Sequence, residues 1–473
     1  MRVVVAGGSI AGLTAGLALT RSGHEVTIVE RDGQPTPATA ELAASAWPRG
    51  GVPQSRQPHG FICRVRADVR AAAPDLWRDL LEAGAVEHDL FTHRPPAMRD
   101  VPREPADDDL VFLLCRRTTF EWVLRRTVER ECDLRLGTRA EGLLLDDRAS
   151  APRVVGLGTS GGSLAADLVV DASGRSGGLA RRLKAAGVEA PPVSDEPCGI
   201  EYTSRFYRLR PGVTPGPLNR IWAAGGVFGG YSCVLFPHDA DTLSVGFGRL
   251  PGDASLVGVH SQEGFDRAVA AVPFVREWLD PAQAEPLTPP VPMAGIHNML
   301  TGIPDVRGLV GIGDAVCTTD PAFGRGAAIA LASGFALARA VDESVDVDAL
   351  PRHFGAWFAE NVVPWHADSV AQDRGRTAMW QAAVASDSPP APPPPGSPAV
   401  LVAASLAGVD PSLWRGFVRY AGMLDPPGSL QSPAVADRVG ALSASGWTPT
   451  KVDAPSHREM AELVGTRPCP PGR

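Results

Sequence analysis

The first thirty residues follow a pattern of apolar positions that changes twice. Residues 3–5 are a run of valines, typical of a strand that is buried on both faces, and residues 13–21 place apolar side chains at helical spacing. A turn at 22–24 leads to a second β-branched run at 26–29. This order predicts a strand, a tight turn, a helix and a second parallel strand, which together form a βαβ unit.

Two later segments repeat the passage from a buried strand into a turn and a helix. Residues 133–175 contain several short strands, the last of which, 168–170, runs into a small-residue turn and an arginine-rich helix. Residues 309–312 form another buried run, and the glycine-rich segment 324–326 begins a long helix of small and apolar residues. We expect these two segments to converge on the first βαβ unit.

The rest of the chain differs in pattern. Residues 200–249 contain strand-like runs rich in aromatic side chains, whereas 264–279 and 346–380 have helical spacing. The proline-rich segment 386–398 predicts a stiff linker or surface excursion before a C-terminal tail. We expect the two apolar segments of this tail to form helices that pack on the preceding domain or cover the substrate entrance.

Composition narrows the class of protein. A chain of 473 residues with 44% hydrophobic and 21% charged side chains predicts a globular protein of two or three domains. The net charge of −8 argues against a nucleic-acid partner. The seven cysteines lack metal-like spacing, so we expect them reduced and mostly buried, with no metal site. No stretch approaches ~18 uninterrupted apolar residues, which favours a cytoplasmic protein without membrane association.

The first turn, GGSIAG, has the chemistry of a dinucleotide-binding loop. Gly7 and its neighbour Gly8 allow the tight turn, and Gly12 allows the helix to pack close to the strand. Ser9 stands where the usual pattern has its second glycine, and its hydroxyl is placed to donate to a phosphate oxygen. Glu30 follows Gly12 by 18 residues, close to the ~20 expected for the carboxylate that binds the adenosine ribose.

These segments carry a resemblance to a known family. GGSIAG with Glu30, the VVDASGR turn and GDAVCTTDPAFGRGAA occur in the order and spacing of FAD-dependent monooxygenases of the para-hydroxybenzoate hydroxylase type. Within that group the chain looks most like bacterial polyether epoxidase and squalene epoxidase-like flavoenzymes. The segments 49–61 and 115–129 support the resemblance, which covers about residues 1–345.

The resemblance implies a role for particular residues. The first loop and Glu30 would bind the ADP half of FAD, Asp314 would bind the ribityl chain, and Arg117, with Arg116 as a competing candidate, would lie near the phosphates. Arg49, Gln54 and His59 fall in the loop that passes the flavin in related enzymes, and His59 is a candidate acid or base or else a hydrogen-bonded structural group. The segment expected beside the flavin ring contributes Pro321, Gly324, Arg325 and Gly326.

Two departures from the family pattern bear on the chemistry. Ser173 replaces the usual aspartate of the DG turn, which leaves the mode of reduction by a nicotinamide cofactor open. Arg325, in GRGA where the nearest branch has GQGM, is expected to place a cation near the flavin or the pocket mouth, and we list it as a candidate catalytic residue. That cation would favour an anionic substrate or the anionic reduced flavin.

The implied activity is oxygenation of a hydrophobic substrate. NAD(P)H would visit transiently and reduce FAD, dioxygen would give a flavin hydroperoxide, and one oxygen atom would pass to a polyketide, terpenoid or aromatic molecule by hydroxylation or epoxidation. Alternate residues of the aromatic strands would line the pocket, although each can equally belong to the sheet core. The candidates are Tyr202, Phe206, Trp222, Tyr231, Phe236 and Phe247.

Two other functions compete with this one. A flavin dehydrogenase or reductase would consume no dioxygen, and a non-catalytic binding protein would use the same scaffold without redox chemistry. Halogenation is disfavoured because the chain lacks the W-x-W-x-I-P segment and its only lysines are Lys184 and Lys451.

The predicted architecture is an α/β fold with a Rossmann-like FAD-binding domain of the GR2 type, an inserted antiparallel substrate sheet and a C-terminal helical region. We assign 1–75, 105–185 and 290–345 to the FAD-binding domain, 76–104 and 186–289 to the substrate domain, and 346–473 to the helical region.

Overall fold

The computed structural model describes residues 1–146, 151–344, 346–386, 398–449 and 452–465. A parallel five-stranded sheet forms the centre of its nucleotide-binding part, with the strand order β18-β9-β1-β2-β5. Its strands are β1 (Arg2–Ala6), β2 (Glu25–Glu30), β5 (Asp133–Leu136), β9 (Leu168–Asp171) and β18 (Leu309–Gly311). The predicted βαβ unit is therefore present, and the two later strand-turn segments join the same sheet.

Helices pack closely around this sheet. Helix α1 (Ile10–Arg21) is apolar on nearly all sides and is buried between the sheet, α5 (Arg117–Glu131) and α8 (Arg325–Glu343). A Cβ atom on Gly334 of α8 would lie 2.9 Å from the backbone nitrogen of Ala15. The small side chains of α8 thus let two helices approach closely, which fixes the N-termini of both against the sheet edge.

A second sheet is antiparallel and has six strands. Its order is β12-β13-β14-β11-β15, and β16 also pairs with β11. The strands are β11 (Glu201–Leu209), β12 (Ala224–Val227), β13 (Tyr231–Pro237), β14 (Thr242–Arg249), β15 (Ala284–Pro286) and β16 (Val291–Met293). Helix α7 (Gln262–Ala271) and the C-terminal helix α14 (His457–Val464) share a separate hydrophobic core with one face of this sheet. The other face is directed at the nucleotide-binding part.

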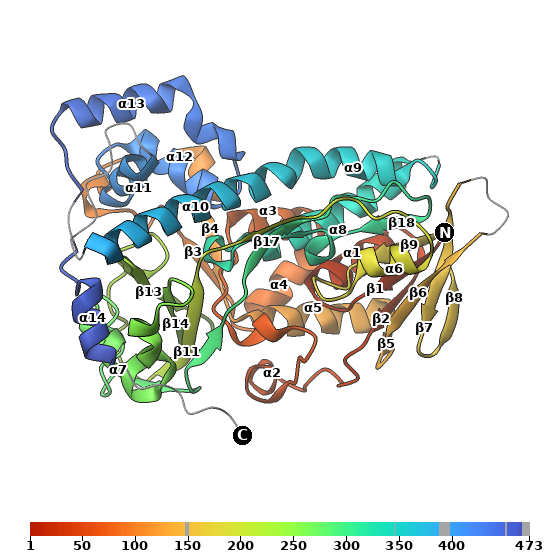
Figure 1. The fold of residues 1–473 in the computed structure, drawn as a ribbon, viewed down its shortest axis with the longest axis horizontal. Helices are drawn as coiled ribbons and strands as arrows, with labels where there is room; N and C mark the ends of the chain where they lie inside the picture. Colours follow the sequence, from red (N-terminus) through yellow and green to blue (C-terminus); the bar gives the residue numbers. More distant parts are fainter. Residues whose placement is uncertain (147–150, 345, 387–397, 450–451, 466–473) are drawn as a thin grey trace.

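Smaller elements complete the fold (Figure 1). Strands β6 (Ala140–Leu145), β7 (Val154–Thr159) and β8 (Gly162–Ala165) form one antiparallel sheet, and β10 (Ser194–Pro197), β17 (His297–Leu300) and β19 (Cys317–Thr318) form another. Strands β3 (Val86–Asp89) and β4 (Val111–Leu114) pair with each other. The remaining helices of this region are α2 (Ala40–Ala46), α3 (Cys63–Ala72), α4 (Pro74–Glu82) and α6 (Leu179–Ala185).

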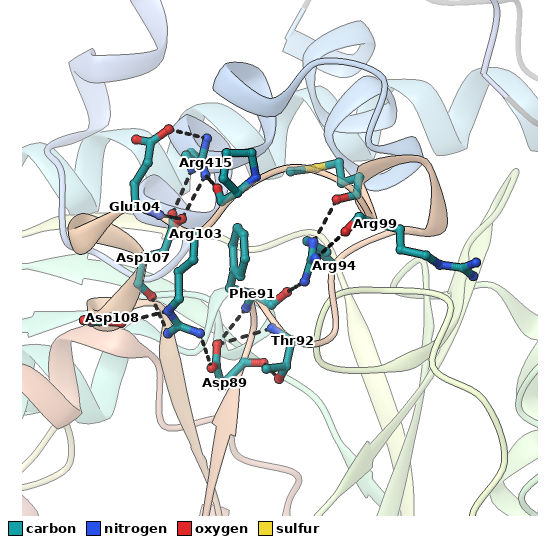
Figure 2. A network of polar contacts seen from close by, with 12 residues as sticks. Asp89, Phe91, Thr92, Arg94, Arg99, Arg103, Glu104, Asp107, Asp108 and Arg415 are labelled. Carbon is teal, nitrogen blue, oxygen red and sulfur yellow. Dashed lines mark hydrogen bonds and ion pairs between the residues drawn. The ribbon is translucent and has the colours of Figure 1, made fainter.

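The C-terminal region is helical, as predicted. It contains α9 (Leu350–Asn361), the long α10 (Val363–Ser386), α11 (Pro398–Ala407), α12 (Pro411–Ala421) and α13 (Pro433–Ala444). Figure 2 shows how α12 is held: Arg415 pairs with Glu104 and Asp107 of the segment before β4, and Phe91 lies beneath the guanidinium groups of Arg415 and Arg103. Because Trp414 and Val418 of α12 also enter the main core, the tail is an integral part of the fold.

Some expected boundaries differ from the observed ones. Helix α7 ends at Ala271 rather than 279, and 219–223 is a loop rather than the start of a strand. Helix α4, which we assigned to the substrate domain, contributes Leu76, Trp77 and Leu80 to the main core around the parallel sheet. The division into domains stays a prediction, as packing does not separate α4 from α3 and α5.

Two expectations from composition can be compared with the structure. Each of the six described cysteines is a free thiol, and five of them are buried. Cys469 and most of the proline-rich segment lie outside the described residues. Among the helices of the described part, none has the length and apolarity needed to cross a membrane.

Candidate functional site

The three predicted segments meet at the carboxyl edge of the parallel sheet. Strand β9 lies between β1 and β18, so that Asp171 is in register with Ala6 on one side and with Gly311 on the other. The turns that follow these strands are therefore neighbours. A Cβ atom on Gly313 would lie 2.7 Å from the Cβ of Ala11 in α1. This edge is where open α/β sheets bind their ligands.

Glycine is required in the first turn for steric reasons. Gly7 has a φ of +116°, and a Cβ on it would lie 2.3 Å from the carbonyl oxygen of Ala172. A Cβ on Gly12 would lie 1.9 Å from the carbonyl oxygen of Gly7. Both positions therefore act as predicted, because they let the chain turn tightly and let α1 begin directly against β1.

Ser9 has a different partner from the one we expected. It is the N-cap residue of α1, but its hydroxyl makes no capping hydrogen bond. Instead Ser9 Oγ donates to Glu121 Oε1 at 2.6 Å and accepts from Arg117 Nη2 at 3.1 Å. Since the hydroxyl proton is already used by Glu121, a phosphate at this helix end would be bound by backbone N–H groups and arginine rather than by the serine hydroxyl.

Glu30 ends β2 directly beside the first turn. The side chain is buried, with Oε2 accepting from the backbone nitrogen of Gly8 at 2.6 Å and Oε1 accepting from that of Asp32 at 2.8 Å. A carboxylate oxygen has two lone pairs, so each keeps capacity for a hydroxyl donor. The position fits the predicted ribose contact.

A buried glutamate that the sequence analysis missed organises the arginines. Glu121 of α5 accepts from Arg49 Nη2 and from Arg117 Nε, each at 3.2 Å, in addition to Ser9. Despite burial, these guanidinium groups and the serine bond lower the pKa of Glu121 to about 2. The signal in the sequence is the spacing of four between Arg117 and Glu121 on a predicted helix, which places the two side chains on one face.

The choice between the two adjacent arginines is resolved by their partners. Arg117 lies beside Ser9, whereas Arg116 binds Asp239 through its backbone nitrogen and its guanidinium group and also reaches Glu41. Arg117 is therefore the residue at the nucleotide loop. Arg116 joins the end of β4 to the turn between β13 and β14.

His59 is placed between the loop and Arg117. Arg117 Nη1 donates to Nε2 of the imidazole at 3.1 Å, so Nδ1 carries the proton and donates to the carbonyl oxygen of Gln57 at 2.8 Å. Burial and the charge of Arg117 lower the pKa of His59 to about 3. The neutral ring has both nitrogens occupied, which favours a role in orienting Arg117; the predicted acid or base role stays a prediction.

The third segment offers an acceptor and a helix end. Within the described chain no donor reaches the carboxylate of Asp314, which follows β18, and burial raises its pKa while Arg117 and Arg175 oppose that shift. The loop then passes Pro321 to Gly324, whose φ is +67° and which is the N-cap residue of α8. A Cβ on Gly326 would meet nothing within 4 Å. The N-terminus of α8 thus stays open to an electron-rich ligand.

The position of the Arg325 side chain corrects one prediction. Its guanidinium group pairs with Asp368 of α10 at 2.6 Å, donates to Ser369 Oγ at 2.7 Å, and lies 4.8 Å from the ring centroid of Trp365. Arg325 is therefore neutralised by Asp368 and is not a free cation for an anionic substrate. The backbone of Arg325 still begins α8.

The six predicted pocket aromatics do not all lie on one face of the antiparallel sheet. Tyr231 and Phe247 are fully buried in the core with α7 and α14, on the face away from the nucleotide loop, which corrects their assignment. The alternate face carries Tyr202, Phe206 and Phe236, in register with Gly248 and Ser244 of β14. These three aromatics are half-buried and belong to the face whose Ser204 binds Gln57 of the flavin loop.

Trp222 lies outside the strands. Its ring packs 4.7 Å from that of Phe112 in β4. It belongs to the loop that precedes β12, where the neighbouring Ile221 accepts a hydrogen bond from His88 Nε2 at 3.0 Å. The loop therefore joins the antiparallel sheet to β3 and β4.

Arg220 in the same loop is a second residue that the sequence analysis missed. Its side chain is half-buried and finds no hydrogen-bond or ion-pair partner among the residues that the structure describes. Burial alone lowers the pKa of its guanidinium group, with no contribution from a carboxylate. An arginine that is partly withdrawn from water and has no partner among the described residues is costly for the fold, which is the property expected of a residue that binds an anion.

The site as a whole fits FAD. The glycine turn, Glu30 and the Arg49–Arg117–Glu121 cluster lie at one end of the sheet edge, and Asp314 and the open N-terminus of α8 lie further along it. Asp314 keeps an unused acceptor for a hydroxyl-rich chain. An extended molecule with ribose, phosphates and a polyol would meet complementary groups in that order.

Comparison with known proteins supports this assignment. Residues 2–109 match the family described as FAD dependent oxidoreductase. Protein Rv3254 of Mycobacterium tuberculosis is 28% identical over 346 residues, which cover 68% of this chain and 69% of that protein. The resemblance found in the sequence is confirmed: the N-terminal region is an FAD-dependent oxidoreductase domain, with FAD as its cofactor.

Solved structures show the same fold. The flavin-dependent brominase Bmp2 aligns with a TM-score of 0.61 at 17% identity, covering 94% of this chain and all of that one (100%). PqsL from Pseudomonas aeruginosa, named a probable FAD-dependent monooxygenase, aligns with a TM-score of 0.58 at 17% identity, covering 82% of this chain and 100% of that one. The predicted fold class is therefore confirmed.

Proposed function

We propose that this chain, which carries an FAD-dependent oxidoreductase domain, is a monooxygenase that uses NAD(P)H and dioxygen to oxygenate a hydrophobic substrate. The observation that carries the proposal is the convergence of three distant segments on one sheet edge, opposite an antiparallel sheet with a half-buried aromatic face. FAD, when bound, supplies the redox chemistry with dioxygen. The residues of the chain bind and orient the reactants and exclude water.

Each part of the site would bind a different part of FAD. Gly8, Glu30 and Arg117 hold the nucleotide half, and Glu121 keeps the arginines in place. Asp314 and the N-terminus of α8 receive the polyol and the ring. Because α8 is 19 residues long and its first N–H groups have no side-chain cap, its dipole favours negative charge that develops on the ring.

The proposed substrate combines an apolar body with an acidic group. Tyr202, Phe206 and Phe236 present a half-buried aromatic surface on one face of the sheet, a lining that suits a flat or extended apolar molecule. Arg220, which borders this sheet and has no partner within the described chain, is the group that would bind a carboxylate or other anion. A hydrophobic natural product with an acid function has both properties.

The decisive experiment measures turnover directly. The purified protein should show a bound-flavin spectrum, and NAD(P)H oxidation with dioxygen uptake should be stimulated by members of a panel of polyenes and phenols. Flavin reduction without dioxygen uptake for every compound would instead support a dehydrogenase or reductase. If the purified protein bound no flavin, the result would instead support a non-catalytic binding role.

Replacing Arg220 by glutamine should weaken the binding of acidic ligands at least tenfold. It should leave neutral analogues of the same carbon skeleton unaffected, because only the charge-assisted bond is lost. Binding can be followed by isothermal titration calorimetry without turnover. Arg210→Gln is the matched control, because Arg210 is an exposed arginine that directly follows β11 and pairs with Glu285. Equal loss for acids and neutral analogues would show that Arg220 has only a structural role.

Halogenation remains the less favoured alternative despite the fold shared with a brominase. Flavin halogenases need a lysine beside the oxidant. In this chain Lys184 is instead exposed on α6. Lys451 lies outside the described residues. Monochlorodimedone-type halide assays on the reduced enzyme would reveal halogenation if it occurred.

A further inference from the structure

A buried polar cluster lies directly behind the flavin-binding loop. We define the aspartate cluster as Tyr202 of β11, Asn298 of β17, Asp320 of the loop, and Asp373 and Arg376 of α10. Asp320 immediately precedes Pro321, so it belongs to the segment that leads into the N-terminus of α8. The sequence alone does not indicate this cluster, because its five residues come from four separate elements.

The contacts form a closed network. Asp320 Oδ1 accepts from Tyr202 OH at 2.9 Å and from the backbone nitrogen of Ala322 at 2.8 Å. The backbone nitrogen of Asp320 donates to Asn298 Oδ1 at 2.9 Å, and Asn298 Nδ2 donates to Asp373 Oδ2 at 2.7 Å. The loop is thereby tied to the substrate sheet, to β17 and to α10 through one carboxylate and its peptide group.

The charges of the network do not balance when both carboxyl groups are ionised. Arg376 Nη2 lies 2.9 Å from Asp320 Oδ2 and 2.8 Å from Asp373 Oδ1, and the two aspartates are 0% and 2% exposed. One guanidinium group neutralises one carboxylate. The second negative charge would be buried without compensation beside the first, so the pair retains a proton.

A metal ion is a poor explanation for the cluster. Ligand atoms of Cys198, Asp320 and Asp373 lie within 4.8 Å of one another. However, Arg376 already lies between the two carboxylates, and burial raises the pKa of the Cys198 thiol, which disfavours the thiolate that metals bind. The arrangement is a carboxyl pair with its own counter-ion.

We propose that Asp373 and Arg376 are positioning residues for the flavin-binding loop, which they hold through Asp320 by a carboxyl pair that shares one proton. Loss of this proton would place two buried negative charges side by side and would release Asp320, and with it the segment that begins α8. The binding of FAD would then be linked to the binding of one proton by a cluster that lies behind the flavin-binding loop. The inference rests on the proposed FAD site.

The surroundings of Asp373 identify it as the group that changes charge. Burial and the neighbouring Asp320 raise the pKa of Asp373 to about 8. Burial raises the pKa values of Cys198 and Tyr202 well above their ordinary values, so both stay neutral in this range, and Arg376 stays charged. Asn298, the remaining neighbour, does not titrate.

The sign of the effect on stability follows from the direction of the shift. The pKa of Asp373 is higher in the folded protein than the ordinary value of 3.8, so the folded state binds more protons between these pH values. The contribution of Asp373 to stability therefore falls as pH rises from about 4 to about 8 and stays low above that. An asparagine at 373 keeps the acceptor for Asn298 and can donate to Asp320, although it loses the acceptor for Arg376; it therefore imitates the protonated acid in being uncharged at every pH.

The test titrates FAD into the apoprotein at several pH values from 6.5 to 9.5. Wild-type affinity should fall by up to about tenfold per pH unit above about 8, the dependence for loss of one proton, and D373N should remove that dependence. R376Q should weaken FAD binding already at pH 7. Arg374→Gln, on the same helix but paired with Glu196 at the surface, should behave as wild type.

A second measurement keeps the inference separate from the proposed function. The melting temperature of the apoprotein should decline less between pH 5 and pH 8.5 in D373N than in wild type, whether or not FAD binds. Failure of all variants and wild type to bind FAD would refute the proposed cofactor site but not the carboxyl pair. Identical pH profiles for wild type and D373N in both measurements would overturn the inference.

Discussion

Replacing Gly12 by alanine should abolish FAD binding and lower the free energy of unfolding by about 3 kcal/mol, at the upper end of the range for overpacked cores. The new Cβ would lie 1.9 Å from the carbonyl oxygen of Gly7, a backbone atom that cannot move aside as the end of a flexible side chain could. Helix α1 would have to move away from β1, and its N-terminal N–H groups would leave the phosphate position. Denaturant unfolding and the flavin content of the purified protein measure the two effects.

The matched control is Gly375→Ala. Gly375 is an exposed residue within α10, and a Cβ there would meet nothing within 4 Å. An alanine at such a position should be neutral or stabilise the helix by up to ~1 kcal/mol. FAD affinity at the wild-type level in the Gly12 variant would contradict the proposed packing of the loop.

Replacing Glu121 by alanine should have the second large effect, a loss of about 3–5 kcal/mol, which is the range for breaking a buried ion pair by removing one partner. Arg49 and Arg117 would keep their charges within the protein, and Ser9 would lose its acceptor. The arginines would then reorient, so the FAD affinity should fall by at least a hundredfold. Calorimetric unfolding and flavin titration provide the two readouts.

Two further variants separate charge from shape. Glu121→Gln keeps an acceptor for Ser9 but not the charge, so its effect should lie between wild type and the alanine variant. Glu131→Ala removes a carboxylate from the same helix, where Glu131 pairs with Arg21 near the surface. That change should cost less than about 1 kcal/mol and leave FAD binding unchanged. Equal effects at 121 and 131 would rule out a special role for the buried cluster.

The local part of the site could be predicted because the signals are close together in sequence. The order of valine strand, GGSIAG, helix and Glu30 requires only that neighbouring elements fold as a βαβ unit. The parallel pairing of β1 with β2 and the contact between Gly8 and Glu30 are direct consequences of it. The resemblance to flavin monooxygenases added Arg117 and Asp314, which the structure places at the same edge.

Side-chain direction was the main source of wrong expectations. Arg325 follows a helix N-cap as predicted, but its guanidinium group pairs with Asp368, some forty residues later in the chain, and is not free for a substrate. Tyr231 and Phe247 lie in the expected strands, yet their register directs them to the core with α7. A strand pattern shows that alternate residues share a face but does not state which face meets the flavin domain.

The sequence by itself determined the glycine turn with Glu30 and the class of the fold, because these depend on local backbone geometry and on short spacings. Only the tertiary structure decided which charges are neutralised: Glu121 between two arginines, Arg325 on Asp368, and Asp320 with Asp373 on one guanidinium group. The partners in most of these contacts are tens of residues apart or more. The electrostatic free energy of a buried charge depends on distances of a few ångströms, and those distances exist only once the elements have packed.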